Sequence, residues 1–174
     1  MKRAFSVFAA VIIFLLTATG CEKQIIGEKT PPSPPESFSA TLEIVYGDIT
    51  MTADFTQNSS EDFSIKMLTP EILSPLTVTY QSGICKIIYD GLEFESDMTR
   101  FPQTEFGALL TQAIADIKSD IEITKTYNEG IWTYSGSSER GVFTMTRDAE
   151  TGAWLELEIE GAPLHIVFTD FKTQ

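Results

Sequence analysis

The stretch that decides the fold is residues 38–56, which read Phe-Ser-Ala-Thr-Leu-Glu-Ile-Val-Tyr-Gly-Asp-Ile-Thr-Met-Thr-Ala-Asp-Phe-Thr. Apolar and polar side chains alternate on both sides of the dipeptide Gly47-Asp48. Because successive side chains of a strand point to opposite faces, this alternation predicts two half-buried strands. The dipeptide between them predicts a turn, so the folded part opens with an antiparallel hairpin.

The same alternation continues along the chain. It marks further strands at 63–67, 76–80, 85–89 and 92–94, where Asp90-Gly91 is a hairpin dipeptide, and then at 121–126, 131–135, 141–147, 154–160 and 164–171. No strand-helix-strand alternation occurs, which argues against a parallel sheet. The predicted fold class is mainly β (α+β): a large curved antiparallel sheet or half-barrel of about eleven strands, wrapped over one main helix.

The helix is predicted between the two groups of strands, over residues 104–118. Its apolar side chains recur at helical spacing, and Thr104 is a suitable N-cap. The presumptive inner faces of the strands carry more apolar side chains than one helix of about four turns covers, which predicts a hydrophobic cavity between sheet and helix. The residues expected to line it are Phe63, Ile65, Met67, Val78 and Tyr80 on the sheet and Phe106, Leu109, Leu110, Ile114 and Ile117 on the helix.

The N-terminal residues have the pattern of a bacterial lipoprotein signal. Lys2 and Arg3 form a basic start, residues 4–16 are apolar but too few to span a bilayer, and small residues precede Cys21. We therefore expect a signal peptide over 1–20, lipid attachment at Cys21, a proline-rich tether over 21–37 and a single β domain over 38–174. The protein would be extracytoplasmic in the cell envelope, anchored to the membrane by lipidated Cys21; ordinary secretion is the alternative.

Composition excludes several kinds of partner and chemistry. The chain has 12 basic and 25 acidic residues, a net charge of −13, and no cluster of basic residues, which disfavours nucleic-acid binding. His165 is the single histidine and alternates onto the polar face of its strand, so neither a histidine-based metal site nor a general base is indicated. The sequence predicts no enzyme, no cofactor and no metal.

Three further features have a plain structural interpretation beside a functional one. Cys85 alternates in phase with Ile87 and Tyr89, which favours a buried structural thiol over a reactive one. The acidic row Glu156, Glu158 and Glu160 is typical of a solvated sheet face, and the alternative is a site for a cation or a basic partner. The aromatic residues Trp132, Tyr134 and Trp154 either pack in strands or mark a protein-interaction surface.

Three local sequences carry a resemblance to a known family. They are Ile-Tyr-Asp-Gly-Leu-Glu-Phe at 88–94, the Phe-Pro pair at 101–102 before the helix, and Leu-His-Ile-Val-Phe-Thr-Asp-Phe at 164–171. With the alternating meander around them, they resemble the LolA/LolB-like lipoprotein-carrier superfamily over about residues 38–171. The resemblance implies a half-open barrel that holds acyl chains in an apolar cavity.

Two functions follow from these observations. The first is an exported lipoprotein that binds a lipid or acylated molecule between the curved sheet and the helix. The alternative is a non-enzymatic envelope module with a filled core, which senses or binds a protein partner.

Overall fold

A computed structural model describes residues 30–59, 62–97, 106–138 and 141–174. The chain divides into two compact units, Met1–Thr30 and Pro31–Gln174. Of the first unit only Thr30 is described, so the predicted signal peptide and Cys21 lie outside the described residues.

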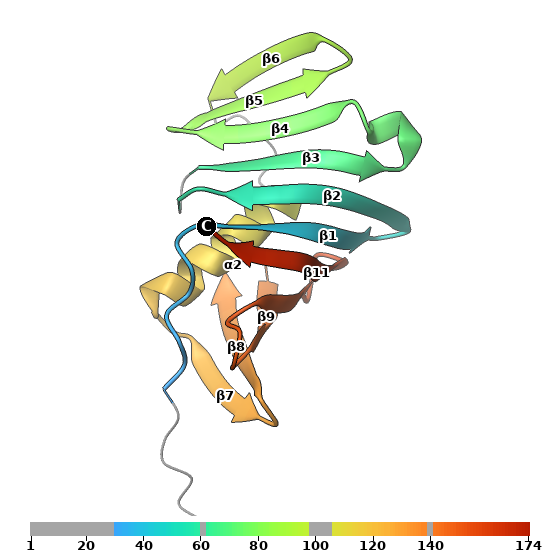
Figure 1. Ribbon diagram of the computed structural model, residues 1–174. Coiled ribbons are helices and arrows are strands. Elements are labelled where there is room, and N and C mark those ends of the chain that lie inside the picture. Colours follow the sequence, from blue (N-terminus) through green and yellow to red (C-terminus); the bar gives the residue numbers. More distant parts are fainter. Residues whose placement is uncertain (1–29, 60–61, 98–105, 139–140) are drawn as a thin grey trace, which may run out of the picture. The chain divides into compact units, whose positions relative to one another are not determined.

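The second unit is a single antiparallel sheet with one α-helix (Figure 1). Its elements are β1 (Phe38–Tyr46), β2 (Ile49–Gln57), β3 (Phe63–Thr69), a 3-10 turn η1 (Glu71–Leu73), β4 (Leu76–Gln81), β5 (Ile84–Tyr89), β6 (Leu92–Asp97), α2 (Phe106–Ser119), β7 (Thr124–Asn128), β8 (Ile131–Ser138), β9 (Gly141–Asp148), β10 (Trp154–Ile159) and β11 (Leu164–Thr173). The predicted fold class, with eleven strands and one main helix, is confirmed.

The strand order shows how the chain builds the sheet. The order is β6-β5-β4-β3-β2-β1-β11-β10-β9-β8-β7, so the first six strands run outward from the centre and the last five return to it. First and last strands pair in the middle, where Leu42 lies opposite Phe168. The outermost strands β6 and β7 do not pair with each other, so the sheet stays open. In Figure 1 the strand direction turns between β3 and β8, as the twist of a wide sheet requires.

The core lies between α2 and the central strands of the sheet. Buried side chains of α2 are Gly107, Leu109, Leu110, Ala113, Ile114 and Ile117, which repeat at helical spacing. The inner rows of the central strands contribute Phe38, Leu42, Ile44, Phe55, Leu157 and Ile166, each shielded from solvent. The amphipathic stripe predicted for the helix therefore forms one hydrophobic cluster with the sheet.

Two strands differ in detail from the prediction. The strand expected at 121–126 starts at Thr124, because Asp120 and Glu122 have positive φ angles, which a strand does not accommodate. In β10 the pairing with β9 shifts register between Trp154 and Glu156. This bulge turns Trp154 to the inner face and leaves Leu155 half-buried, although strict alternation with Leu157 would place Leu155 inside.

The residues predicted as a tether partly belong to the folded unit. Pro31–Ser37 precedes β1 and is included in the second compact unit. The Pro32 carbonyl accepts a hydrogen bond from Arg147 at 2.8 Å. Ser37 is bonded to the C-terminal Gln174 through both its backbone and its hydroxyl. We call Pro31–Ser37 the N-terminal strap.

Candidate functional site

The inner face of the sheet divides into a covered and an open part. All ten residues predicted to line a cavity lie on this face or on the facing side of α2, and they belong to one hydrophobic cluster or pack against it. Eight of them are buried, whereas Val78 and Phe106 are half-buried. The structure thus brings the predicted residues together, and their binding of a ligand stays a prediction.

The covered part ends at β3. There the helix comes so close to the sheet that a side chain on Gly107 would meet Ile65: an added Cβ would lie 2.6 Å from the Ile65 Cδ1 atom. Phe63 lies 3.6 Å from the same point. In Figure 1, α2 lies behind the central strands, while β4–β6 extend beyond it. The helix therefore packs against the inner rows of β1–β3. On β4 and β5, Tyr80 and Cys85 are buried as well, whereas the other inner side chains of β4–β6 are half-buried or exposed.

We call the less buried part of the inner face of β4–β6 the open inner face. Register pairs Leu76 with Tyr89 and Val78 with Ile87 across β4 and β5. It then pairs Tyr89 with Leu92 and Ile87 with Phe94 across β5 and β6. Leu76, Val78 and Ile87 are half-buried, and exposure increases outward to 59% for Phe94 and 75% for Leu92. These six residues form the open inner face, an apolar surface continuous with the core.

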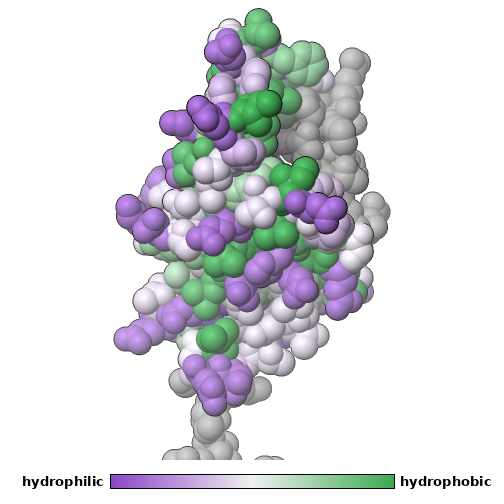
Figure 2. All heavy atoms as spheres, turned by 90° about the vertical axis from the view of Figure 1, so that its right-hand side faces the viewer, coloured by the Kyte–Doolittle hydropathy of each residue, from purple (hydrophilic) through white to green (hydrophobic). Residues whose placement is uncertain are grey.

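Large apolar residues exposed at this end of the sheet lie among charged ones. Figure 2 shows hydrophobic groups (green) between hydrophilic ones (purple) along the side of the molecule that is at the right of Figure 1. The Tyr89 hydroxyl donates a hydrogen bond to the carbonyl of Ile72, at 3.0 Å, which holds its ring against the strand. Ile72 is itself 72% exposed. The open inner face is therefore bordered by η1 at one end.

The opposite face of the same strands is partly ionic. Lys86 on β5 makes ion pairs with Glu93 at 2.7 Å and Glu95 at 3.7 Å on β6. The hydrogen bond to Glu93 raises the pKa of the Lys86 ammonium above its usual range. Ile84 lies on this outer face and is 50% exposed. It is an exposed apolar residue on the same hairpin that does not belong to the open inner face.

A second feature is a buried polar cluster in the other half of the sheet. Arg147 on β9 is only 4% exposed, and its register neighbours are Trp132 on β8 and Trp154 on β10. Its guanidinium lies over the Trp154 ring, 5.2 Å from the centroid. Burial lowers the pKa of Arg147, and the neighbouring Tyr134 hydroxyl offsets part of this decrease. The three aromatic residues of this region are packed in strands rather than exposed.

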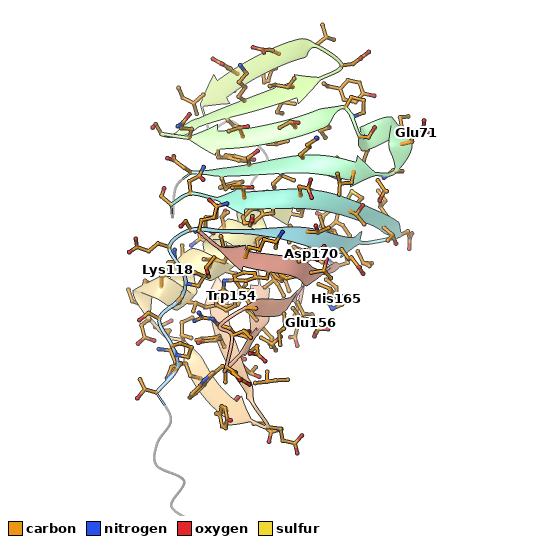
Figure 3. All side chains as sticks on the ribbon, viewed as in Figure 1. Glu71, Lys118, Trp154, Glu156, His165 and Asp170 are labelled. Carbon is orange, nitrogen blue, oxygen red and sulfur yellow. The ribbon has the colours of Figure 1, made fainter. Side chains whose placement is uncertain are left out.

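The residues considered for catalysis lie elsewhere and do not converge. His165 and Glu156 lie side by side on the outer face, 3.9 Å apart, and both are substantially exposed (Figure 3). Glu158 and Glu160 are exposed as well, as expected for a solvated row. Cys85 is buried, as predicted. Within the described residues, no group of three or more His, Cys, Asp or Glu side chains is arranged to hold a metal ion.

Of the six residues of the open inner face, the sequence predicted only Val78 as a candidate ligand contact. Sequence reasoning missed Leu76, Ile87, Tyr89, Leu92 and Phe94. Ile87 and Tyr89 were placed in phase with Cys85 by their alternation, and that pattern was the available signal for their inward direction. The pattern gave no indication of how far α2 extends over the sheet, and that extent decides which inner side chains the helix covers.

Among the helices of the described part of the chain, none is both long and apolar enough to cross a membrane.

Comparison with known proteins gives structural matches only. Neither a protein-family model nor a curated protein matches the chain. An uncharacterized conserved protein from Thermus thermophilus matches with a TM-score of 0.54 at 10% identity, over 80% of each chain. A LolA superfamily protein from Nitrosomonas europaea matches with a TM-score of 0.41 at 10% identity, over 81% of this chain and 87% of the other. At this identity, the first likeness shows a shared fold alone.

Proposed function

We propose that this protein binds an acyl chain or an acylated molecule on the open inner face, beside the N-terminal end of α2. The observation that carries the proposal is the decrease in burial across the inner face of the sheet, from β3 to the edge strand β6. Ile65 on β3 is buried under the helix, Val78 and Ile87 are half-buried, and Leu92 at the edge is largely exposed. An apolar surface that continues a core beyond its cover is typical of a ligand or partner site.

The strength of such binding follows from the area removed from water. Each methylene buried contributes about 0.8 kcal/mol, so eight methylenes of an acyl chain contribute roughly 6 kcal/mol before the cost of ordering the chain. The open inner face has no carboxylate of its own, because Glu93 and Glu95 point to the outer face and pair with Lys86. A neutral or anionic amphiphile therefore meets no charge repulsion from this row.

The setting of the proposal is the cell envelope. The basic start, the apolar run and the small residues before Cys21 support export and lipid attachment, and the protein would act there as a non-enzymatic carrier or sensor of acylated molecules. The second compact unit would face the extracytoplasmic side. The proposal gives no residue of the open inner face a catalytic role.

A second candidate is a protein-binding module, and a specific observation favours it. Eight of the ten residues first expected to line a ligand cavity are buried in a packed core. In that case the exposed Leu92 and Phe94, on an edge strand of the sheet, would contact a protein partner.

The experiment is native mass spectrometry of the purified protein with lipid extraction, followed by titration with a fluorescent fatty acid. The test variant is Leu92→Glu, which places a charge on the open inner face at a largely exposed position. Its matched control is Ile84→Glu, which places the same charge on the outer face of the same hairpin. We expect Leu92→Glu to lose the ligand and Ile84→Glu to retain it. An absence of co-purifying lipid together with no fatty-acid uptake would contradict lipid binding and favour the protein-binding function for this surface.

A further inference from the structure

Arg147 is a buried cation without an acidic partner among the described residues. Its Nε–H donates to the Gly152 carbonyl at 2.6 Å, and its Nη1 donates to the Pro32 carbonyl at 2.8 Å. Neither acceptor carries a charge, and none of the ion pairs found in the described part of the chain includes Arg147. A buried charge is normally paired, so this arrangement is costly for the protein alone.

Two other polar groups beside Arg147 are also buried. They are the Tyr134 hydroxyl and the Trp154 indole N–H, on residues that are 1% and 0% exposed. The indole N–H has no hydrogen-bond partner, and the hydroxyl makes no hydrogen bond of good geometry, although it interacts with the guanidinium and raises the pKa of Arg147. The Tyr134 and Trp154 rings meet edge to face, with centroids 5.7 Å apart. Buried polar groups are hydrogen-bonded in the great majority of cases, so an indole N–H without an acceptor beside a cation without an acidic partner indicates a missing acceptor.

The unused groups are almost all donors. A guanidinium has five N–H groups, of which two are accounted for, and an indole N–H only donates, while a hydroxyl can donate. The group that accepts several hydrogen bonds and also neutralises a positive charge is an oxyanion. Gly152 packs directly against the guanidinium: a Cβ there would stand 2.8 Å from Nη2, so the absence of a side chain is what permits this approach.

The N-terminal strap closes this region. Pro32 is half-buried and bonded to Arg147, and Ser37 is fixed to Gln174. Glu36, between these contacts, interacts electrostatically with Lys118 at the C-terminal end of α2. The Pro32 carbonyl is the one strap acceptor that Arg147 uses, so movement of the strap would release a donor for another acceptor.

We propose that Arg147, Tyr134 and Trp154 form a binding site for an oxyanion, a carboxylate or phosphate group, and that the N-terminal strap covers it. The Pro32 carbonyl accepts a hydrogen bond from Nη1 of the guanidinium until the oxyanion replaces it as acceptor. The site lies in the β8–β10 half of the sheet, apart from the open inner face on β4–β6. Its occupation does not depend on the function proposed above.

Tryptophan fluorescence tests the proposal on the intact protein. The chain has two tryptophans, and both flank Arg147 on neighbouring strands, so emission reports on this site. Four probes are titrated at constant ionic strength: acetate, inorganic phosphate, octanoate and octyl phosphate. We expect a saturable change with an oxyanion. A response to acetate or phosphate identifies a free anion as sufficient, and a response restricted to the octyl compounds identifies an amphiphile head group.

The deciding variant is Tyr134→Phe, which removes one oxygen atom and keeps the ring. Because the hydroxyl makes no hydrogen bond of good geometry in the unliganded protein, the melting temperature of this variant should change little, whereas its affinity should fall about tenfold. Arg147→Gln should abolish the response, and Lys86→Gln, on the other half of the sheet, should leave it unchanged. Three results would each overturn the site: no saturable response in the wild type, an undiminished response in Tyr134→Phe, or a marked loss of stability in Tyr134→Phe.

Discussion

Gly107 of α2 faces Ile65 of β3 at such short range that an added Cβ would stand 2.6 Å from the Ile65 side chain. This contact brings the N-terminal end of α2 against β3, the strand that lies next to the open inner face. The absence of a side chain at position 107 is what allows the approach.

Gly107→Leu should therefore destabilise the folded unit by about 2–3 kcal/mol, because the leucine has to displace Ile65 and Phe63 from a packed core. Urea denaturation measures the difference. The matched control is Ala108→Leu, one residue along at a half-buried position, which should change the free energy of unfolding by roughly 0.5 kcal/mol or less. Equal effects of the two substitutions would show that the helix does not pack against β3 through Gly107.

Leu110→Glu should prevent folding rather than act only on a ligand. The Leu110 side chain has no solvent exposure and belongs to the main hydrophobic cluster, so the substitution buries an unpaired carboxylate. Circular dichroism should show loss of the cooperative thermal transition. Leu110→Ala is the milder test and should cost about 3 kcal/mol. A folded Leu110→Glu protein would mean that the core between helix and sheet admits water.

Gly141→Ala should destabilise the unit by about 2–4 kcal/mol. Gly141 begins β9 with a φ of +130°. An added Cβ would clash with the carbonyl oxygen of Glu160, the residue that follows β10. Gly47→Ala provides the comparison, since Gly47 also has a positive φ, of +60°, but no atom lies within 4 Å of the added Cβ. There only the backbone strain remains, about 1 kcal/mol. Thermal melts of both variants give the ranking.

Asp148→Asn should lower the melting temperature at neutral pH but not in acid. Asp148 accepts hydrogen bonds from the Thr151 backbone and hydroxyl and from the Glu150 backbone, which hold the pKa of its carboxyl below the ordinary value. A depressed pKa stabilises the fold above the unfolded pKa of about 3.9, and this stability is lost as the pH falls through the folded value. Wild type and variant should thus differ at pH 6 and converge near pH 2. A constant difference at both values would contradict this account.

Cys21→Ser should abolish incorporation of labelled palmitate when the gene is expressed in a bacterial host, because the thiol at position 21 is the predicted lipid acceptor. Cys85→Ser is the matched control and should remain labelled, since Cys85 is buried inside the sheet. Labelling that survives Cys21→Ser would exclude lipid attachment at this residue and favour ordinary secretion.

Much of the fold was predictable because burial on one face imposes a two-residue period on each strand. That period located the strands around Leu42, Ile65 and Ile166, and the change to helical spacing located α2. The start of β7 was misplaced, since positive φ angles at Asp120 and Glu122 leave no mark in an apolar pattern. The inward direction of Trp154 was likewise hidden, because a bulge adds one residue to the alternation.

The sequence by itself determined the alternating strands, the helix and the inward rows, since these depend on the side chains of residues close together in the chain. Tertiary structure alone decided three relationships between distant residues: the pairing of β1 with β11, the contact of α2 with β3, and the meeting of Arg147 with Pro32. The physical reason is that local periodicity specifies which face of an element is buried but not which partner buries it. The open inner face and the buried arginine both follow from that second choice.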